Sequence, residues 1–366
     1  MKVKIGELTK IKTGKLDANA ASEDGQYPFF TCSKEPLRIS TYSYDCECVL
    51  VAGNGDLNVK YYNGKFDAYQ RTYIIEDNGS GKLYMPYLYY FMEGYIEELR
   101  KQAIGGVIKY IKLGNLTDAL IELPSVDEQK SIVEILVKTK GILEKRNDEL
   151  NALDNLIKAR FVEMFGDPVA NDMGWDTLPL ENVCKAIVDC PHSTPSYTNE
   201  DTGFMCIRTS IVKKNKILWD DIEYISEDEF AKRIQRKKPE VGDIVYTREG
   251  AILGIAAIID RDCNVALGQR SMLLSPDIDK CTSEFLCVAM NSDSFLDNAL
   301  KGISGSASPH INVGDIKAFR MIMPPIELQN QFADFVHQVT KSKVAVRRAL
   351  DEAQLLFDSL MQQYFG

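Results

Sequence analysis

Long apolar runs are missing from this chain of 366 residues. No stretch approaches the roughly 18 unbroken apolar residues that a membrane-spanning helix needs. The N-terminal segment MKVKIGELTKIKTGK is charged and has no apolar run behind it, which argues against a secretory signal. We therefore expect a cytoplasmic protein, and its length predicts two or three globular domains.

Histidine is scarce, and a pair of CxxC motifs is absent. The three histidines, His192, His310 and His337, are too scattered along the chain to indicate a catalytic triad. Cys184, Cys190 and His192 lack a convincing fourth ligand, so we do not expect a structural zinc site. The nine cysteines are an odd number, and we interpret them as reduced and mostly buried thiols.

Recognisable enzyme motifs are missing as well. An adenine methyltransferase would need a glycine-rich cofactor loop and an NPPY-like tetrapeptide, and the sequence contains neither. The GSGK stretch, Gly79–Lys82, fails as a Walker motif because position 76 is glutamate and position 83 is leucine. Asp127, Glu128 and Lys130 resemble a nuclease trio, but capping of a helix explains them better. An enzyme remains open only if its site is assembled from residues that no motif marks.

What the sequence does contain is an internal repeat. The segment RFVEMFG, Arg160–Gly166, returns as LMQQYFG, Leu360–Gly366, at an offset of 200. The same offset, without a gap, also aligns Lys101 with Lys301, Ile111 with Ile311, Gly114 with Gly314, Pro124 with Pro324, Gln129 with Gln329, and Leu150 with Leu350. The chain is therefore interpreted as two copies of one unit.

Each copy ends in a long helix. Ser125 and Glu128 form a capping-box pattern after Pro124, and Gly166 with Pro168 ends the first helix. The helix spans about 40 residues, or roughly 60 Å. Apolar residues recur every seven positions, which is typical of a coiled-coil seam. The seam positions are Leu136, Leu143, Leu150 and Ile157 in the first helix and Val339, Val346, Leu350, Phe357 and Leu360 in the second.

Two interpretations of these apolar stripes are open. The helices can pair antiparallel and hold two globular parts at opposite ends, or each stripe can pack on its own domain. A helix of about 40 residues is too long to be covered by one small domain. We therefore favour the antiparallel coiled coil, with packing on the domain in the first and last turns.

The segments before the helices have a mixed α/β texture. Short β-type runs such as DCECVLVAG and GDIVYTREG alternate with glycine-rich turns and a few helical stretches. We predict two mixed α/β domains, at residues 1–123 and 167–323, separated by long helices at 124–166 and 324–366. The two domains share AYQRTYII, Ala68–Ile75, and LGQRSMLL, Leu267–Leu274, but diverge strongly elsewhere.

This arrangement of variable domain, long helix, second variable domain and second long helix resembles the specificity subunits of Type I restriction-modification systems. The resemblance covers the whole chain. It rests on the LPxxxEQ-type motif at the start of the long helix, the FG at its end and the different sequences of the two variable domains. The stretches GNGDLNVKYYNGKFDAYQRT and DCPHSTP with GDIVYTREG and LGQRS look like two types of target-recognition domain. One departure is Leu328, which stands where Glu128 stands in the first copy.

The resemblance implies a non-catalytic subunit that reads a bipartite, asymmetric site in double-stranded DNA. It further implies two modification subunits that methylate adenine with S-adenosylmethionine, and restriction subunits that use ATP and magnesium. This chain itself would hold no cofactor or metal. The competing interpretation is a coiled-coil scaffold or adaptor protein that does not read DNA.

The net charge of −10 argues against a DNA-binding protein, but its distribution matters more. Residues 167–323 contain 24 acidic and 17 basic side chains, whereas the rest of the chain is nearly balanced. The same segment carries two basic runs, IVKKNK and AKRIQRKK. The protein can therefore have one basic face that attracts DNA and one acidic face that repels it. Because the total charge is negative, we expect weak binding to DNA without partners.

Candidate DNA contacts are polar side chains on turns, because forked and amide groups read base edges while cations hold phosphates. In the first domain they are Asn54, Asn58, Lys60, Tyr61, Tyr62, Lys65, Gln70 and Arg71. In the second they are His192, Ser193, Arg208, Thr209, Lys213, Lys214, Thr247, Arg248 and Arg270.

Some of these candidates have a second interpretation. Gln70 and Arg71 recur in the second domain as Gln269 and Arg270, so they suit phosphate contact or support of the fold better than base readout. The stretch SGSAS, Ser304–Ser308, either offers backbone amides to a phosphate or is a plain linker.

Overall fold

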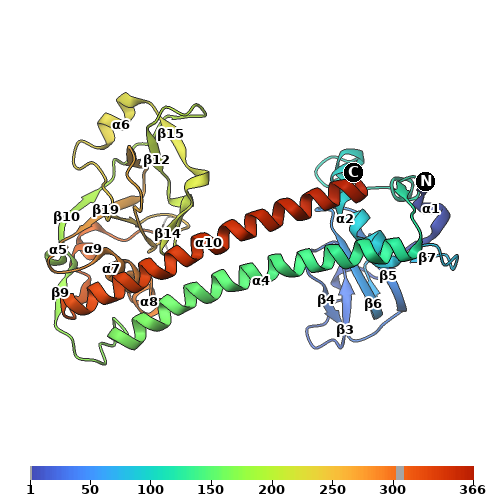
Figure 1. Ribbon diagram of the computed structural model, residues 1–366, viewed down its shortest axis with the longest axis horizontal. Helices are drawn as coiled ribbons and strands as arrows, with labels where there is room; N and C mark the ends of the chain where they lie inside the picture. Colours follow the sequence, from blue (N-terminus) through green and yellow to red (C-terminus); the bar gives the residue numbers. More distant parts are fainter. Residues whose placement is uncertain (1, 302–308) are drawn as a thin grey trace. The chain divides into compact units, whose positions relative to one another are not determined.

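The computed structural model describes residues 2–301 and 309–366, so the SGSAS stretch lies outside the described residues. The chain divides into two compact units (Figure 1). Unit 1 comprises residues 1–147 and 347–366, and unit 2 comprises residues 148–346. The division falls inside the long helices α4 (Val126–Phe165) and α10 (Ile326–Phe365), so each unit contains part of both.

Unit 1 is built around a six-stranded sheet with the order β2-β7-β5-β6-β3-β4, and β1 pairs separately with β8. Its strands are β1 (Lys2–Lys4), β2 (Thr9–Thr13), β3 (Tyr27–Phe30), β4 (Leu37–Ile39), β5 (Tyr44–Ala52), β6 (Val59–Ala68), β7 (Thr72–Asp77) and β8 (Leu120–Glu122). Its shorter helices are α1 (Ile5–Leu8), η1 (Ala18–Ala20), α2 (Met85–Gln102) and α3 (Leu113–Thr117).

Strand β5 explains why this sheet is buried on both faces. Successive side chains of a strand point to opposite faces. Val49 and Val51 join the cluster that contains α2, whereas Cys48 and Leu50 join a second cluster formed with Phe66 on the other face. The run CVLVA is therefore apolar without alternation, because both faces of the strand need apolar side chains.

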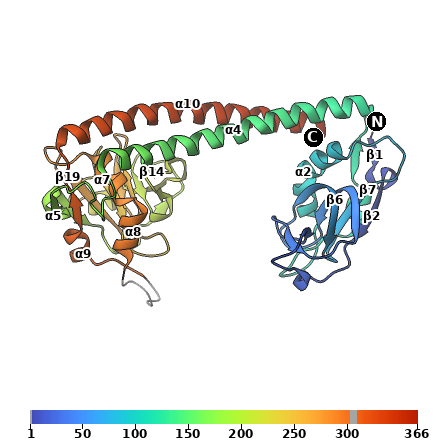
Figure 2. The same ribbon diagram turned by 90° about the horizontal axis from the view of Figure 1, so that it is seen from below.

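Helix α2 connects the sheet with the long helices of unit 1. Figure 2 shows α2 between the sheet and the C-terminal part of α10. The rings of Tyr87 and Phe91 lie 5.1 and 6.2 Å from the ring of Phe365. The last turn of the chain is thus part of the core of unit 1.

Unit 2 contains two four-stranded sheets, ordered β10-β19-β16-β17 and β11-β15-β12-β18, and two small pairs, β13-β14 and β20-β9. Its strands are β9 (Thr177–Pro179), β10 (Cys184–Asp189), β11 (Tyr197–Thr198), β12 (Met205–Ile207), β13 (Val212–Lys213), β14 (Lys216–Ile217), β15 (Glu223–Ile225), β16 (Ile244–Thr247), β17 (Ala256–Ile258), β18 (Val265–Leu267), β19 (Ser271–Pro276) and β20 (Arg320–Ile322). Its shorter helices are α5 (Leu180–Val183), η2 (Thr209–Ile211), η3 (Trp219–Asp221), α6 (Glu227–Arg233), α7 (Ser283–Met290), α8 (Asp293–Leu300) and α9 (Val313–Ala318).

The first sheet of unit 2 also packs on both faces. Ile244 and Tyr246 of β16 face the core that contains α7 and the long helices, whereas Val245 between them faces the core that contains Trp219. The centre of the first core is a group of rings, with Phe285 of α7 centred 5.5 Å from Phe161 of α4. The long helices are therefore fastened to each unit by aromatic side chains.

The two units repeat one frame. The order β1-α1-β2 before the large sheet of unit 1 returns as β9-α5-β10 in unit 2, and α3-β8-α4 returns as α9-β20-α10. The hydrogen bond from the amide of Ile5 to the carbonyl of Ala119, 2.9 Å, has its counterpart between Leu180 and Phe319, 2.8 Å. The predicted internal repeat and mixed α/β fold are confirmed.

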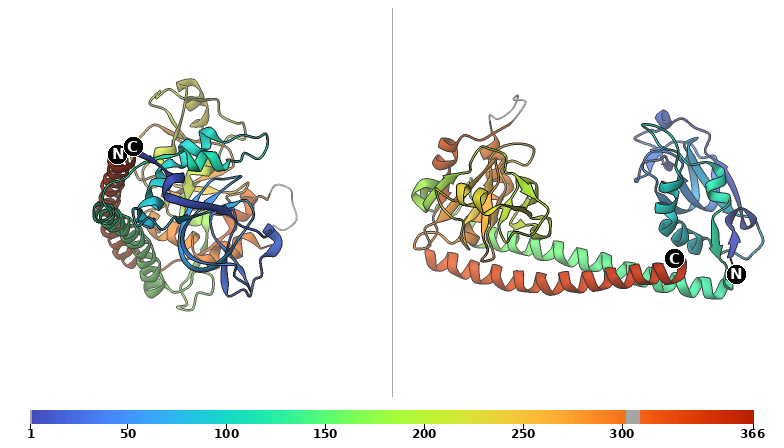
Figure 3. Two further views of the ribbon diagram at one scale, coloured as in Figure 1. Left: turned by 90° about the vertical axis from the view of Figure 1, so that its right-hand side faces the viewer. Right: turned by 90° about the horizontal axis from the view of Figure 1, so that it is seen from above.

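Within each unit, the parts of the two long helices lie side by side and run in opposite directions (Figure 1, Figure 3). In unit 2, Phe161 packs against Phe332, and Lys343 pairs with Asp154. In unit 1, Leu136 shares a core with Phe357 and Leu360. Residue numbers rise along one helix as they fall along the other, so the predicted antiparallel coiled coil is confirmed.

The seam positions are removed from solvent to different degrees. The buried ones are Leu136, Leu150, Ile157, Val339 and Val346, and the half-buried ones are Leu143, Leu350, Phe357 and Leu360. Leu136 and Ile157 also belong to the cores of their units. The two interpretations of the stripes therefore both apply, each to a different stretch of the helices.

Local signals fix the ends of α4 as predicted. The amide of Ser125 donates to Glu128 Oε2 at 2.8 Å, and the amide of Glu128 donates to Ser125 Oγ at 3.3 Å, which completes the capping box. At the other end Gly166 has φ +72°, the left-handed conformation that ends a helix without strain only at glycine or asparagine.

Candidate nucleic-acid interface

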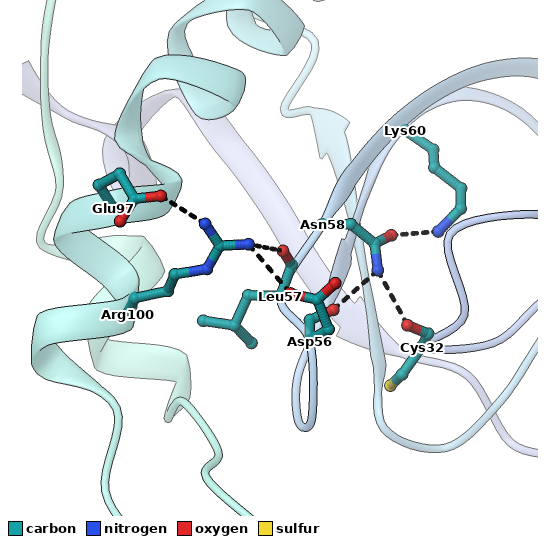
Figure 4. A network of polar contacts seen from close by, with 7 residues as sticks. All are labelled: Cys32, Asp56, Leu57, Asn58, Lys60, Glu97 and Arg100. Atoms are coloured by element: carbon teal, nitrogen blue, oxygen red, sulfur yellow. Dashed lines mark hydrogen bonds and ion pairs between the residues drawn. The ribbon is translucent and has the colours of Figure 1, made fainter. Parts of the chain in front are cut away.

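In unit 1, the predicted residues Asn54 and Asn58 lie in the turn between β5 and β6, and Lys60 lies at the start of β6. Figure 4 shows Asn58 and Lys60 side by side. The Asn58 amide donates to the carbonyls of Cys32 at 2.8 Å and Asp56 at 2.9 Å, and its Oδ1 accepts from the Lys60 ammonium. Because its amide is used to hold the turn, Asn58 presents less of its polar surface to a ligand than a free asparagine would.

The other side of this turn is held from α2. Arg100 donates to Asp56 Oδ1 at 3.0 Å and to the carbonyl of Leu57 at 3.2 Å, while it also pairs with Glu97. Figure 4 shows that Arg100 and Asn58 form hydrogen bonds with this turn from opposite sides. The turn is therefore a fixed platform, and burial lowers the pKa of Lys60 beside it.

Further along β6 the predicted residues separate. Tyr62 packs its ring 5.1 Å from that of Phe30, so most of it supports the core. Lys65 lies 4.6 Å above the ring of Tyr42. Tyr61 is 38% exposed and donates to Glu47 Oε1 at 2.7 Å. Partial burial, and then this hydrogen bond to a carboxylate, raise the pKa of Tyr61.

The turn between β6 and β7 carries Gln70 and Arg71. Gln70 donates to Asp17 Oδ1 at 2.8 Å. The carbonyl of Arg71 accepts from the amide of Gly53 at 2.8 Å, so its backbone lies against the platform turn while its side chain is exposed. The structure thus brings Asn54, Asn58, Lys60 and the backbone of Arg71 together, whereas Gln70 contacts Asp17 and Lys65 contacts Tyr42.

In unit 2, Thr247 and Arg248 are buried. The sequence-based prediction that they lie on an exposed turn is therefore wrong. Arg248 is buried and donates to both carboxylate oxygens of Asp189, at 3.0 and 3.3 Å. His192 Nε2 lies 3.1 Å from the same carboxylate. Thr247 is fully buried, and its hydroxyl accepts from the amide of Ile255 at 2.9 Å. This placement favours support of the fold for Thr247 and Arg248, whereas His192 is exposed.

A polar hollow of about 110 Å³ collects three of the other predicted residues of unit 2, Arg208, Thr209 and Arg270. Arg208 pairs with Glu223 and lies over the ring of Tyr197, and Arg270 has φ +71°, a conformation uncommon for a residue other than glycine. Sequence analysis did not single out the remaining lining residues, Thr194, Tyr197 and Ser210, or predict that Gln269 lies with them. Tyr197 belongs to a two-residue strand, which is too short to produce a periodic signal.

Three cations of the basic runs of unit 2 form ion pairs within the described residues, namely Lys214, Arg233 and Lys237. Lys213 donates to the carbonyl of Ser210 at 2.8 Å, and Lys214 pairs with Asp293 at 2.8 Å. Arg233 is buried, pairs with Glu229 and donates to the carbonyl of predicted Ser193 at 2.7 Å. Asp293 and Glu229 thus offset part of the positive charge of the basic runs IVKKNK and AKRIQRKK.

The platform turn of unit 1 has a counterpart in unit 2 that the offset of 200 does not reveal. The amide of Gly55 donates to Lys109 and the amide of Ile111 to Gly53, at 3.0 and 2.9 Å. In unit 2 the same two bonds join Gly250 with Pro309 and Ile311 with Arg248, at 3.1 and 2.8 Å. Both units therefore hold a turn beside the loop that precedes α3 or α9, with different side chains on it.

Among residues 2–301 and 309–366, no group of three or more histidine, cysteine and acidic side chains could hold a metal ion. None of the helices described for these residues is long and apolar enough to cross a membrane.

Comparison with known proteins gives a consistent picture. The family model of the Type I restriction modification DNA specificity domain matches residues 1–152 and 173–353. The chain is 28% identical to the EcoDI specificity subunit of Escherichia coli, over 98% of this chain and 85% of that protein. It is 23% identical to the MjaVIII specificity subunit of Methanocaldococcus jannaschii, over 91% of this chain and 84% of that protein.

Solved structures share the fold at low sequence identity. The S subunit of a Type I restriction-modification system from M. genitalium superposes with a TM-score of 0.60 at 16% identity, over 100% of this chain and 96% of that one. A chain from a structure on complex assembly and conformational transition of the type I R-M system gives 0.56 at 17% identity, over 100% and 97%. Since the family model covers most of the sequence, this chain belongs to the Type I restriction-modification DNA specificity family.

Proposed function

We propose that this chain reads a bipartite, asymmetric DNA site, with unit 1 contacting one half and unit 2 the other. The observation that carries the proposal is that the two units share a backbone arrangement but place different side chains on it. Both units hold a turn by the same pair of backbone hydrogen bonds, but unit 1 presents Asn54 there and unit 2 presents Glu249. Two readers on one scaffold with different side chains would recognise different base sequences.

Within each unit the supporting surface is small and polar. In unit 1 it is the platform turn with Asn54, Asn58, Lys60 and the exposed Arg71. In unit 2 it is the hollow with Arg208, Thr209 and Arg270, next to the exposed His192. Arginine and asparagine are the side chains that form bidentate contacts with guanine and adenine in the major groove.

The long helices suit the docking of partner subunits. Leu156 is 47% exposed and Leu356, its equivalent in the repeat, is 52% exposed, so each helix presents a leucine to solvent at the same position. We propose that equivalent sites of this kind bind two modification subunits. These partners would supply S-adenosylmethionine and the methylation of adenine, and restriction subunits would supply ATP hydrolysis with magnesium.

This chain would then be a non-catalytic subunit. Its net charge of −10 repels DNA, and the internal pairing of Lys214, Arg233 and Arg248 reduces the positive charge that is available for phosphates. Since phosphate contacts supply most of the affinity of a DNA-binding protein, binding by the isolated chain would be weak. The complex with the modification subunits would bind more tightly.

Methylome sequencing tests the proposal. The chain is expressed with the modification subunit encoded beside it in a host that lacks adenine methylation. The expected result is methylated adenine in one motif made of two specific halves and a gap of unspecified bases. Methylation that requires only the modification subunit, or no methylation together with a stable complex, would favour the scaffold or adaptor function instead.

A further inference from the structure

The loop Ile104–Tyr110 in unit 1 ends in an exposed apolar tip that nothing in the proposed readout uses. All seven of its residues are exposed. Val107 is as accessible as in an extended peptide, at 104%, and Ile108 is 63% exposed. Apolar side chains grouped at one exposed point generally mark a contact surface.

The loop is held in one shape by its backbone. Ile104 and Tyr110 exchange two hydrogen bonds, at 3.0 and 2.8 Å, which close the loop at its base. Gly105 has φ +123°, and a Cβ there would lie 2.6 Å from the carbonyl oxygen of Ile108. Only glycine fits this position, so the sequence is adapted to hold the tip outward.

The base of the loop lies directly against the platform turn. Asn54 forms a β-bridge with Tyr110, and the amide of Gly55 donates to the carbonyl of Lys109 at 3.0 Å. A ligand bound by Asn54 would therefore pass within reach of the loop. The same anchoring bonds recur in unit 2 at Gly250 and Ile311.

The charge around the loop indicates what that ligand is. The sequence from Leu99 to Thr117 contains no acidic residue. Arg100 and Lys101 pair with Asp56, Glu97 and Glu98, so the positive charge that this stretch adds at the loop is that of Lys109 and Lys112. Residues 299–314 of the second copy, which the offset of 200 aligns with residues 99–114, also lack acidic residues. Two acid-free segments at corresponding places in a protein of net charge −10 suit a polyanion.

We propose that the loop Ile104–Tyr110 enters a groove of the DNA, where Val107 and Ile108 make apolar contacts with the bases and Lys109 contacts a phosphate. Apolar side chains in a groove pack on thymine methyl groups or wedge between base steps. This inference rests on the proposed function and adds to it an apolar contact beside the polar readout by Asn54.

The test uses the complex of the full chain with its modification subunits and a duplex that carries the methylated motif. The dissociation constant is measured by fluorescence anisotropy at several KCl concentrations. Replacing both apolar residues, Val107→Ser with Ile108→Ser, should weaken binding by roughly tenfold or more with an unchanged salt slope. Lys109→Gln should instead reduce the slope of log K against log salt by about 0.9.

A control substitution elsewhere on the surface, and two substitutions at Val107 that differ only in charge, distinguish a contact with DNA from a general effect of losing an exposed apolar side chain. Ile278→Ser removes an isoleucine of similar exposure, 66%, from a turn of unit 2 outside the candidate interface and should bind like the parent. Val107→Asp and Val107→Asn have the same size and differ in charge. If the tip lies among phosphates, the aspartate variant should bind more weakly, and the difference should shrink at high salt.

Two outcomes overturn the inference. In the first, the double variant binds the duplex as tightly as the parent complex. In the second, its modification subunits no longer copurify, which would assign the tip to a protein contact. If the parent complex shows no preference for the methylated motif, the proposed function fails, and the loop proposal fails with it.

Discussion

Gln129 and Gln329, which the internal repeat aligns, make the same three hydrogen bonds in the two units. Gln129 Nε2 donates to the carbonyls of Lys82 and Pro124, each at 2.9 Å, and its Oε1 accepts from the amide of Tyr84 at 2.8 Å. Gln329 does the same with Lys280 at 3.1 Å, Pro324 at 2.9 Å and Thr282 at 3.1 Å. Both side chains are fully buried, and each ties a long helix to the segment before α2 or α7.

Gln129→Ala should therefore destabilise unit 1. The substitution leaves one amide and two carbonyls without a partner, and each buried unsatisfied group costs about 1–3 kcal/mol. We expect a loss of about 3 kcal/mol or more, measured as faster hydrogen exchange in β5 and β7. Gln329→Ala should produce the same change in β16 and β19, and Gln363→Ala, at an exposed position of α10, should change neither.

Asp189→Asn should destabilise unit 2 without changing the DNA sequence that is read. Removing one partner of a buried ion pair leaves the Arg248 guanidinium uncompensated, at a cost of about 3–5 kcal/mol. Thermal unfolding measures the loss, and methylome sequencing at a permissive temperature measures the motif. His192→Ala, which changes the exposed neighbour of the same carboxylate, should preserve stability. A stable Asp189→Asn variant with an altered motif would instead make Arg248 a base reader.

Replacing residues 167–323 with the corresponding domain of another family member should change one half of the methylated motif and preserve the other. The rings of Phe161 and Phe165 of α4 pack against Phe285 of the exchanged segment, so the donor must carry an aromatic residue there. Methylome sequencing of the chimera beside the parent measures the outcome. A simultaneous change of both halves would contradict separate readout by the two units.

Adding one heptad to both long helices, after Leu143 and after Lys343, should widen the gap between the two specific halves. Seven residues lengthen a helix by about 10.5 Å, which corresponds to roughly three base pairs. A heptad preserves the seam, whereas four residues would rotate it. The measurement is again the methylome. An active variant that still methylates the parental spacing would show that helix length does not set the gap.

The parts of this structure that follow from neighbouring residues were predictable. The heptad stripe, the capping box at Ser125 and the helix end at Gly166 depend on residues a few positions apart, so the sequence displays them directly. The burial of Arg248 was not predictable, because its partner Asp189 lies 59 residues away. Nor was the platform turn, since its counterpart in unit 2 is displaced from the offset that aligns the helices. The acid-free stretch around Val107 is visible in the sequence, but its exposed residues are apolar and do not resemble the polar turn residues that read base edges.

The division of both long helices between the units has a consequence for the order of events during synthesis. Unit 1 begins near the N-terminus, yet its core includes Phe357, Leu360 and Phe365. Since a ribosome makes these residues only after all of unit 2, the first domain to emerge cannot complete its packing until residues 347–366 have been made. Unit 2, which is made from one uninterrupted segment, can finish first. The temporal order of folding is then the reverse of the order in the gene, and the unfinished first unit is the state that a chaperone would have to protect.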